Sequence, residues 1–147
     1  MLLQIKPESE TPIYMQVRDQ IVGGVASGEL KPGDPLPSVR EFARDLSVNY
    51  HTVNKAYALL RDEGYVHIYG RKGVVIAKPP VADAAFVKDI EEKLVKLFAE
   101  AKSKGMMPGE VVLLAEKLSV ADVNDTAEDG KNTGIYTGKY KGEDRNE

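Results

Sequence analysis

The sequence predicts a mainly α-helical protein with one small β-hairpin, followed by a second helical unit. Three observations lead to this prediction. Apolar residues recur at steps of three and four through several separate segments. Turns rich in Pro and Gly separate these segments. Two short β-rich runs, at 65–69 and 74–77, flank a basic tip at 70–73, which is typical of a hairpin.

The first predicted helix begins at Thr11-Pro12, a capping residue followed by a proline that suits the first helical position. Its apolar stripe repeats every fourth residue and comprises Ile13, Val17, Ile21 and Val25. Gly23 and Gly24 lie inside this pattern, where glycine is unfavourable. They indicate either a close packing contact or an early end of the helix before Gly28.

Two short helices are predicted next, joined by a tight connection at 47–48. Ser38 and Glu41 have the spacing of a capping box, in which each side chain accepts a backbone N–H from the other residue. Asn49 opens the second of these helices, and Gly64 ends it as a left-handed cap. The inward positions of the two helices are Val39, Phe42, Ala43 and Leu46, and then Val53, Ala56, Tyr57 and Leu60.

Residues 8–78 are expected to form, in order, a helix, a second helix, a tight turn, a third helix and a hairpin. This order predicts a winged helix-turn-helix domain. In such a domain a helix enters the major groove of DNA, and residues at its N-terminal end reach the base edges. Basic residues of the preceding helix and of the hairpin tip suit phosphates, guanine or an adjacent minor groove. The candidate contacts are Arg40, Tyr50, His51, Asn54, Lys55, Arg71 and Lys72. For any one of them, a solvated surface position is the alternative.

Residues 82–118 predict two amphipathic helices after the stiff boundary at Pro79-Pro80. Gly105 caps the first helix, and Met107-Pro108-Gly109 starts the second. Roughly 37 residues are too few to close a core alone, so the apolar stripes pack on the first domain or on a second copy. We favour the second copy. The predicted dimer interface comprises Phe86, Ile90, Leu94, Leu97, Phe98, Val111 and Leu114.

The remaining residues, 119–147, are polar, with a glycine at every fourth position from Gly130 to Gly142. We expect this tail to be mostly disordered.

Composition excludes several classes of protein. The 147 residues are 42% hydrophobic and 29% charged, which is ordinary for a globular protein. There is no cysteine, which excludes disulfides, thiolate zinc sites and cysteine nucleophiles. No apolar run approaches the roughly 18 residues of a membrane span, and the first residues lack a signal-peptide pattern. We therefore expect a cytoplasmic protein without membrane contact.

The total charge of −3 is unevenly distributed. Residues 1–80 hold ten Lys/Arg against nine Asp/Glu, whereas residues 81–147 hold ten against fourteen. Nucleic-acid-binding proteins are often basic because phosphate contacts release counterions, so any DNA-binding surface here is a local patch.

The sequence gives no indication of catalysis. His51 and His67 belong to different elements and have no third ligand at metal spacing. The glycines at 70–73 lack the spacing and the following Ser/Thr of a phosphate-binding loop. We expect no enzyme activity, no cofactor and no metal.

Six blocks of the first domain resemble the N-terminal domain of the GntR family of bacterial and archaeal transcription regulators. They are Pro12-Ile13-Tyr14, Gly28-Glu29-Leu30-Lys31-Pro32-Gly33-Asp34, Leu36-Pro37-Ser38-Val39-Arg40-Glu41, Val48-Asn49, Thr52-Val53-Asn54-Lys55-Ala56-Tyr57 and Glu63-Gly64-Tyr65-Val66. The resemblance covers about half of the chain. It implies a homodimer on an inverted-repeat operator in double-stranded DNA. The contacts that it implies come from Arg40, from the start of the recognition helix at Tyr50, His51, Thr52 and Asn54, and from the hairpin, or wing, near Gly70 and Arg71.

Two departures from the family pattern concern the operator. Many relatives have arginine at the position of Asn54, and often Arg or Asn-Thr type residues at Tyr50-His51, so we expect an operator other than the commonest one. The wing often has glycine at the position of Arg71, which alters its approach to the minor groove.

The short two-helix extension resembles the YtrA-like subfamily, whose members typically repress neighbouring ABC-transporter genes. The first hypothesis is therefore a dimeric repressor. A pocket between the two copies is one place for a small-molecule effector, whose identity no residue indicates. The alternative is a winged-helix protein–protein interaction module without specific DNA readout, which the weak charge of the first domain favours.

Overall fold

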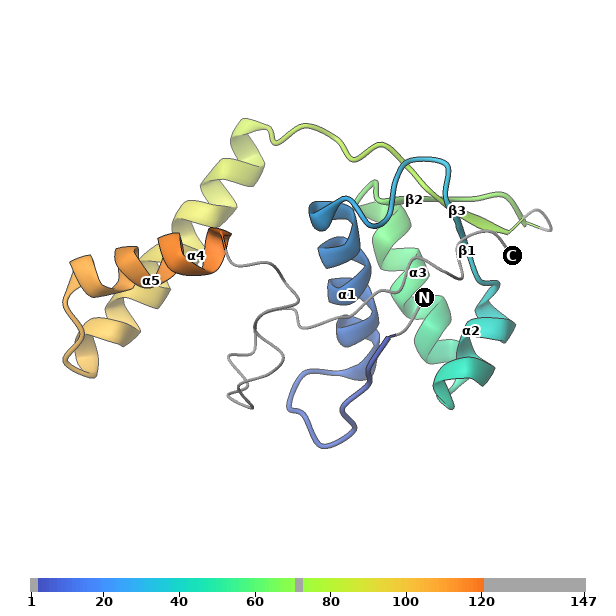
Figure 1. Ribbon diagram of the computed structural model, residues 1–147, viewed down its shortest axis with the longest axis horizontal. Helices are drawn as coiled ribbons and strands as arrows, with labels where there is room; N and C mark the ends of the chain where they lie inside the picture. The colour runs from blue at the N-terminus through green and yellow to red at the C-terminus, as the bar shows by residue number, and fades with distance from the viewer. Residues whose placement is uncertain (1–2, 71–72, 121–147) are drawn as a thin grey trace. The chain divides into compact units, whose positions relative to one another are not determined.

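The computed structural model describes residues 3–70 and 73–120 (Figure 1). The described chain divides into two units, one ending at Pro80 and one beginning at Val81. The glycine-containing tail that was predicted to be disordered lies outside the described residues from residue 121 onward. The first unit contains, in order, α1 (Ile13–Ser27), β1 (Pro35–Leu36), α2 (Val39–Leu46), α3 (Tyr50–Asp62), β2 (Val66–Ile68) and β3 (Val74–Ile76).

Helix α3 lies between α1 and α2 and contacts both of them (Figure 1). Its four predicted inward residues, from Val53 to Leu60, are all fully buried. They pack with Val17 and Ile21 of α1 and with Phe42 of α2 in one hydrophobic core. Burial of such side chains stabilises a fold by roughly 1.5–3 kcal/mol each, so this packing fixes which face of α3 is left for solvent.

The start of α1 differs from the prediction by one residue. Pro12 is the N-cap and not the first helical residue, and no side chain caps this end. The Pro12 carbonyl accepts the N–H groups of Met15 and Gln16, while the Thr11 carbonyl accepts Gln16 Nε2 at 2.8 Å. The helix does not end early at its internal glycines. It continues to Gly28, whose φ of +79° makes the left-handed cap that glycine favours.

Two buried glutamines tie an extended N-terminal segment to α1, a feature that the sequence analysis missed. Gln20 accepts the backbone N–H of Gln4 at 3.0 Å and donates to the Gln4 carbonyl at 2.7 Å. Gln16 forms the same pair of bonds with Lys6, at 2.8 and 2.9 Å. The two carboxamides thus satisfy backbone groups of the extended segment, as a neighbouring strand would. The adjacent Leu3 is buried in the core.

The capping box at the start of α2 is confirmed. The Ser38 hydroxyl accepts Glu41 N–H at 3.2 Å, and the Glu41 carboxylate accepts Ser38 N–H at 3.0 Å. The tight connection after α2 is also present, with Ser47 in the left-handed region at φ +53°. Asn49 then caps α3 by accepting His51 N–H at 2.8 Å.

The wing is part of a three-stranded antiparallel sheet of order β1-β3-β2, whereas the sequence predicted a two-stranded hairpin. The additional strand, β1, pairs Pro35 with Val75 and Leu36 with Val74. The turn before β1 supports this pairing, because Gly33 N–H donates to the Ile76 carbonyl at 2.8 Å. A two-residue strand that begins with proline has no alternating pattern to detect.

Tyr57 joins α3 to the segment that precedes α2. Its hydroxyl donates to the Pro37 carbonyl at 2.8 Å, and its ring stacks on Phe42 with centroids 5.7 Å apart. Burial, with a smaller contribution from the charge of Glu41, raises the pKa of Tyr57 well above its ordinary value. The hydroxyl is therefore a hydrogen-bond donor at every physiological pH.

The described part of the second unit contains α4 (Ala84–Ser103) and α5 (Pro108–Val120), which contact each other. Asp83 caps α4 by accepting Phe86 N–H at 2.8 Å, and Gly105 follows the helix at φ +87°. Pro108 is the first residue of α5, as the sequence predicted. No helix in the described part of the chain is both long enough and apolar enough to cross a membrane.

The apolar stripe predicted as a dimer interface is largely exposed within the single chain. Val111 is buried and Phe98 is half-buried, so these two residues already have partners in the single chain. The exposed members are Phe86, Ile90, Leu94, Leu97 and Leu114.

We expect Tyr57→Phe to lower the free energy of unfolding by about 1–2 kcal/mol, because it leaves the Pro37 carbonyl without its donor. Urea denaturation measures this difference. Tyr69→Phe removes a hydroxyl from an exposed tyrosine and serves as the matched control, with an expected change within about 0.5 kcal/mol. Equal losses in the two variants would contradict the proposed tie.

Candidate nucleic-acid interface

The predicted contact residues of α2 and α3 occupy the N-terminal halves of these helices. Arg40 is the second residue of α2 and is exposed. Tyr50, His51 and Asn54 are exposed on α3, whereas Thr52 is half-buried. The rings of Tyr50 and His51 meet edge to face with centroids 5.7 Å apart. The start of α3 therefore presents two aromatic rings and one carboxamide to solvent.

The Tyr57–Pro37 hydrogen bond determines how the two groups of residues lie relative to each other. Arg40 follows Pro37 by three residues, and Asn54 precedes Tyr57 by three residues, about one helical turn. The bond thus holds the first turn of α2 beside the turn of α3 that carries Asn54. A helix N-terminus also favours a phosphate, because its backbone N–H groups and dipole are positive.

Lys55 does not extend from α3 freely into solvent. Its ammonium lies over the ring of Tyr14 on α1, with Nζ 4.0 Å from the ring centroid. From the sequence, Lys55 was expected beside the other polar residues of α3. The structure instead shows its side chain turned toward α1.

The wing is described in part. Gly70 is exposed at φ +58°, while Arg71 and Lys72 lie outside the described residues. Tyr69 N–H donates to the Gly73 carbonyl at 2.9 Å, which closes the hairpin below its tip. His67 and Tyr69 are exposed with ring centroids 5.9 Å apart, and the sequence analysis did not select them as contacts. Their spacing of two within the β-rich run 65–69, which places side chains on one face of an extended chain, was the available signal.

Arg40 differs from the other described arginines of this unit in its partners. Arg18 binds Glu63 and Asp19, Arg44 binds Asp45 at 3.6 Å, and Arg61 binds Asp62 at 3.2 Å. Among the described residues, Arg40 forms no ion pair. Its full charge is therefore available to an external anion.

Arg18 anchors the far end of α3. Its guanidinium binds the Glu63 carboxylate through two nitrogens and lies 5.9 Å from the centroid of the Tyr65 ring. Burial alone would lower the pKa of Arg18, but the hydrogen bonds that its guanidinium donates to Glu63 and Asp19 raise this pKa above its ordinary value. This arginine therefore holds α1 to α3 and is not a free cation.

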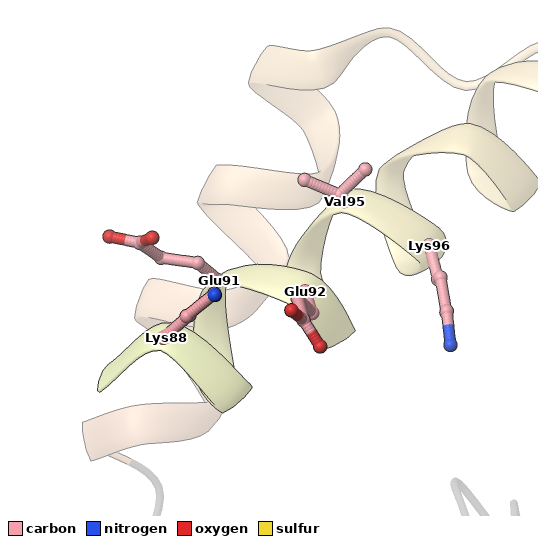
Figure 2. A pocket seen from close by; sticks show the side chains of 5 residues that line it. All are labelled: Lys88, Glu91, Glu92, Val95 and Lys96. Carbon is pink, nitrogen blue, oxygen red and sulfur yellow. The ribbon is translucent and has the colours of Figure 1, made fainter. Parts of the chain in front are cut away.

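Within residues 3–70 and 73–120, no group of three or more His, Cys, Asp or Glu could hold a metal ion. A surface hollow of about 360 Å³ lies along α4 and is lined by Lys88, Glu91, Glu92, Val95 and Lys96 (Figure 2). Figure 2 shows these side chains spreading from the helix and not converging on one point.

Comparison with known families and curated proteins gives a consistent result. Residues 13–76 match the family described as bacterial regulatory proteins, gntR family. The chain is 38% identical over 108 residues to the HTH-type transcriptional repressor YtrA of Bacillus subtilis (strain 168), covering 71% of this chain and 82% of that protein. It is 33% identical over 107 residues to the HTH-type transcriptional repressor NagR of the same strain, but spans only 42% of its length, against 73% of this chain.

A solved structure shares the fold. YtrA from Sulfolobus acidocaldarius, a GntR-family transcription factor, is 40% identical with a TM-score of 0.58, covering 67% of this chain and 99% of that one. This likeness confirms the predicted winged helix-turn-helix with C-terminal helices. The matching family and its members are transcription regulators and not enzymes.

The capping box predicts a loss of stability in acid. The hydrogen bond from Ser38 N–H lowers the pKa of the Glu41 carboxyl below its usual range. A carboxyl whose pKa is lower in the folded state stabilises the fold above its ordinary pKa of about 4.3, and this contribution is lost as the pH falls through the folded-state pKa.

We therefore expect Glu41→Gln, which keeps the acceptor but cannot titrate, to lose less stability than the wild type when the pH falls from about 6 to below about 4. Urea titrations at the two pH values measure the difference. Parallel losses in the two proteins would show that Glu41 does not titrate as described.

Proposed function

Since the chain belongs to the gntR family of bacterial regulatory proteins, we propose that it is a transcriptional repressor that binds an inverted-repeat operator as a homodimer. The first turns of α2 and α3 contact the DNA, and α4 and α5 join the two copies. The observation that carries this proposal concerns Arg40, which is exposed and forms no ion pair among the described residues. Arg40 lies about one helical turn from Pro37, whose carbonyl accepts the hydrogen bond from Tyr57 of the recognition helix.

Helices α2 and α3 make different contacts with the DNA. The exposed carboxamide of Asn54 suits adenine, which it can bind with two hydrogen bonds in the major groove. The planar guanidinium of Arg40 suits guanine or a phosphate. Tyr50 and His51 sit at the N-terminal end of α3, the part of a recognition helix that reaches base edges. The wing near Gly70 approaches the adjacent minor groove or backbone.

A second copy is proposed as the partner of α4 and α5 because these helices leave their apolar stripe exposed. Its larger exposed side chains are Phe86, Ile90, Leu94, Leu97 and Leu114. Large apolar side chains that gather exposed on one element favour an interaction site. Two identical copies form a twofold dimer, which matches the symmetry of an inverted repeat and sets the spacing of its half-sites.

The relatives named above are described as repressors, which supports the proposed direction of regulation. For the regulated genes we propose an ABC-type transporter operon, on the resemblance of the short extension to YtrA-like regulators. A small-molecule effector bound between the two copies would release or recruit the repressor.

We expect Arg40→Ala and Asn54→Ala each to weaken binding to a duplex selected by the wild type from a random-sequence pool. Loss of a specific base contact costs about 1–3 kcal/mol, or roughly 5- to 150-fold in affinity. Arg61→Ala is the matched control for charge, because Arg61 lies at the far end of α3 and is already paired with Asp62. Fluorescence anisotropy at fixed salt measures the affinities.

Unchanged affinity in both interface variants, or an equal loss in Arg61→Ala, would remove the recognition-helix assignment. The salt dependence of binding distinguishes a DNA-binding regulator from a protein-interaction module. Binding to phosphates falls steeply as salt rises, whereas a protein-interaction module without DNA readout would show no selected duplex at all.

We expect Leu94→Glu to convert the dimer into a monomer at micromolar concentration, because it places a charge within the apolar stripe. Val95→Glu is the matched control, since the neighbouring Val95 is 69% exposed and lines the charged side of α4 shown in Figure 2. Sedimentation equilibrium measures both. A Leu94→Glu protein that remains dimeric, or a Val95→Glu protein that dissociates equally, would contradict this interface.

A further inference from the structure

The contact between Lys55 and Tyr14 joins α3 to α1 on the exposed side of the domain. Tyr14 is half-buried and packs against the hydrophobic core, so its ring position is fixed. Lys55 is exposed, yet its Nζ lies 4.0 Å from the centroid of that ring. This distance is well within the range of about 6 Å for a cation–π interaction.

A neutral aromatic partner has a different effect from a carboxylate partner. The ring holds the ammonium without neutralising its charge. Because the ring offers no strong hydrogen-bond acceptor, the N–H donors of the ammonium still require one. By contrast, Arg61 near the other end of α3 is paired with Asp62, and Arg18 is paired with Glu63. The cation of the N-terminal half of α3 is thus positioned with its charge intact, while cations near the C-terminal end are compensated.

The position of Lys55 along α3 indicates what it binds. It follows Asn54 directly, but its side chain is turned toward Tyr14 of α1. A lysine ammonium is a point charge on a flexible stem, and phosphates are the usual targets of such groups at the margin of a major-groove site. Holding the stem against a fixed ring reduces the entropy that this contact would otherwise cost.

We propose that Tyr14 is a positioning residue of the DNA interface, whose ring holds the Lys55 ammonium ready for a backbone phosphate beside the major-groove site. The inference rests on the proposed DNA-binding function and assigns Lys55 to the backbone and not to the bases. It extends the interface to α1, which no base-contacting residue reaches.

A double-mutant cycle tests the proposal in the full chain. Tyr14→Leu, Tyr14→Phe, Lys55→Met and Tyr14→Leu combined with Lys55→Met are titrated with the selected duplex and with a scrambled duplex of equal length, at several salt concentrations. Lys55→Met is expected to weaken binding to both duplexes by a similar factor and to reduce the slope of log affinity against log salt by about 0.9. Tyr14→Leu is expected to weaken binding by about 2- to 5-fold, and to have no further effect in the Lys55→Met background.

Tyr14→Phe separates the ring from the hydroxyl and is expected to bind as the wild type does. A loss in Tyr14→Phe equal to that in Tyr14→Leu would overturn the proposal, because the hydroxyl would then be the contact. An equal loss from Tyr14→Leu with and without Lys55 would also overturn it, since Tyr14 would then act only through the fold.

A measurement without DNA distinguishes this inference from the proposed function. The ε-methylene protons of Lys55 should show an upfield ring-current shift in the NMR spectrum of the wild type and Tyr14→Phe, and lose it in Tyr14→Leu. Absence of that shift in the wild type would overturn the positioning role, whatever the protein binds. Its presence in a wild-type protein that selects no duplex would instead contradict the DNA-binding function, and with it the phosphate assignment.

Discussion

The hydrogen bond from Tyr57 to Pro37 is the constraint on which the rest of the structure depends. Tyr57 is fully buried, and a buried hydroxyl requires a partner. The partner available is the carbonyl that precedes α2, so satisfying one polar group in the core also fixes the start of α2 against α3. This hydrogen bond therefore determines the relative positions of the exposed residues on the two helices. The bond thereby fixes the turn of α2 that carries Arg40 relative to the turn of α3 that carries Asn54.

The charges of the first unit show how a nearly neutral domain can still approach a polyanion. Three of its described arginines are paired with carboxylates, and one of these, Arg18, joins α1 to the end of α3. The cations at the N-terminal halves of α2 and α3 are not paired with carboxylates among the described residues. Arg40 has no ion pair among the described residues, and Lys55 lies on an aromatic ring. Net charge is therefore a poor guide here, because pairing determines which charges remain available.

The sequence predicted those features that depend on local pattern. The inward residues of α3, the Ser38–Glu41 capping box and the glycine that ends α1 all follow from spacing and backbone preference within a few residues. Contacts between residues distant in sequence could not be predicted in this way. The bonds from Gln20 to Gln4 join residues sixteen apart, and β1 exists only because β3 supplies its partner. The direction of the Lys55 side chain likewise depends on where α1 packs.

The most direct test of the account is a map of backbone amide shifts by NMR as the selected duplex is added to the full chain. The account predicts that the largest shifts fall together on the first turn of α2, on Tyr50 through Lys55 and around Gly70, and saturate at one duplex per dimer. Shifts confined to α4 and α5, or spread without preference over the first unit, would contradict it. In either case the surface organised by Tyr57 would not be the one that meets DNA.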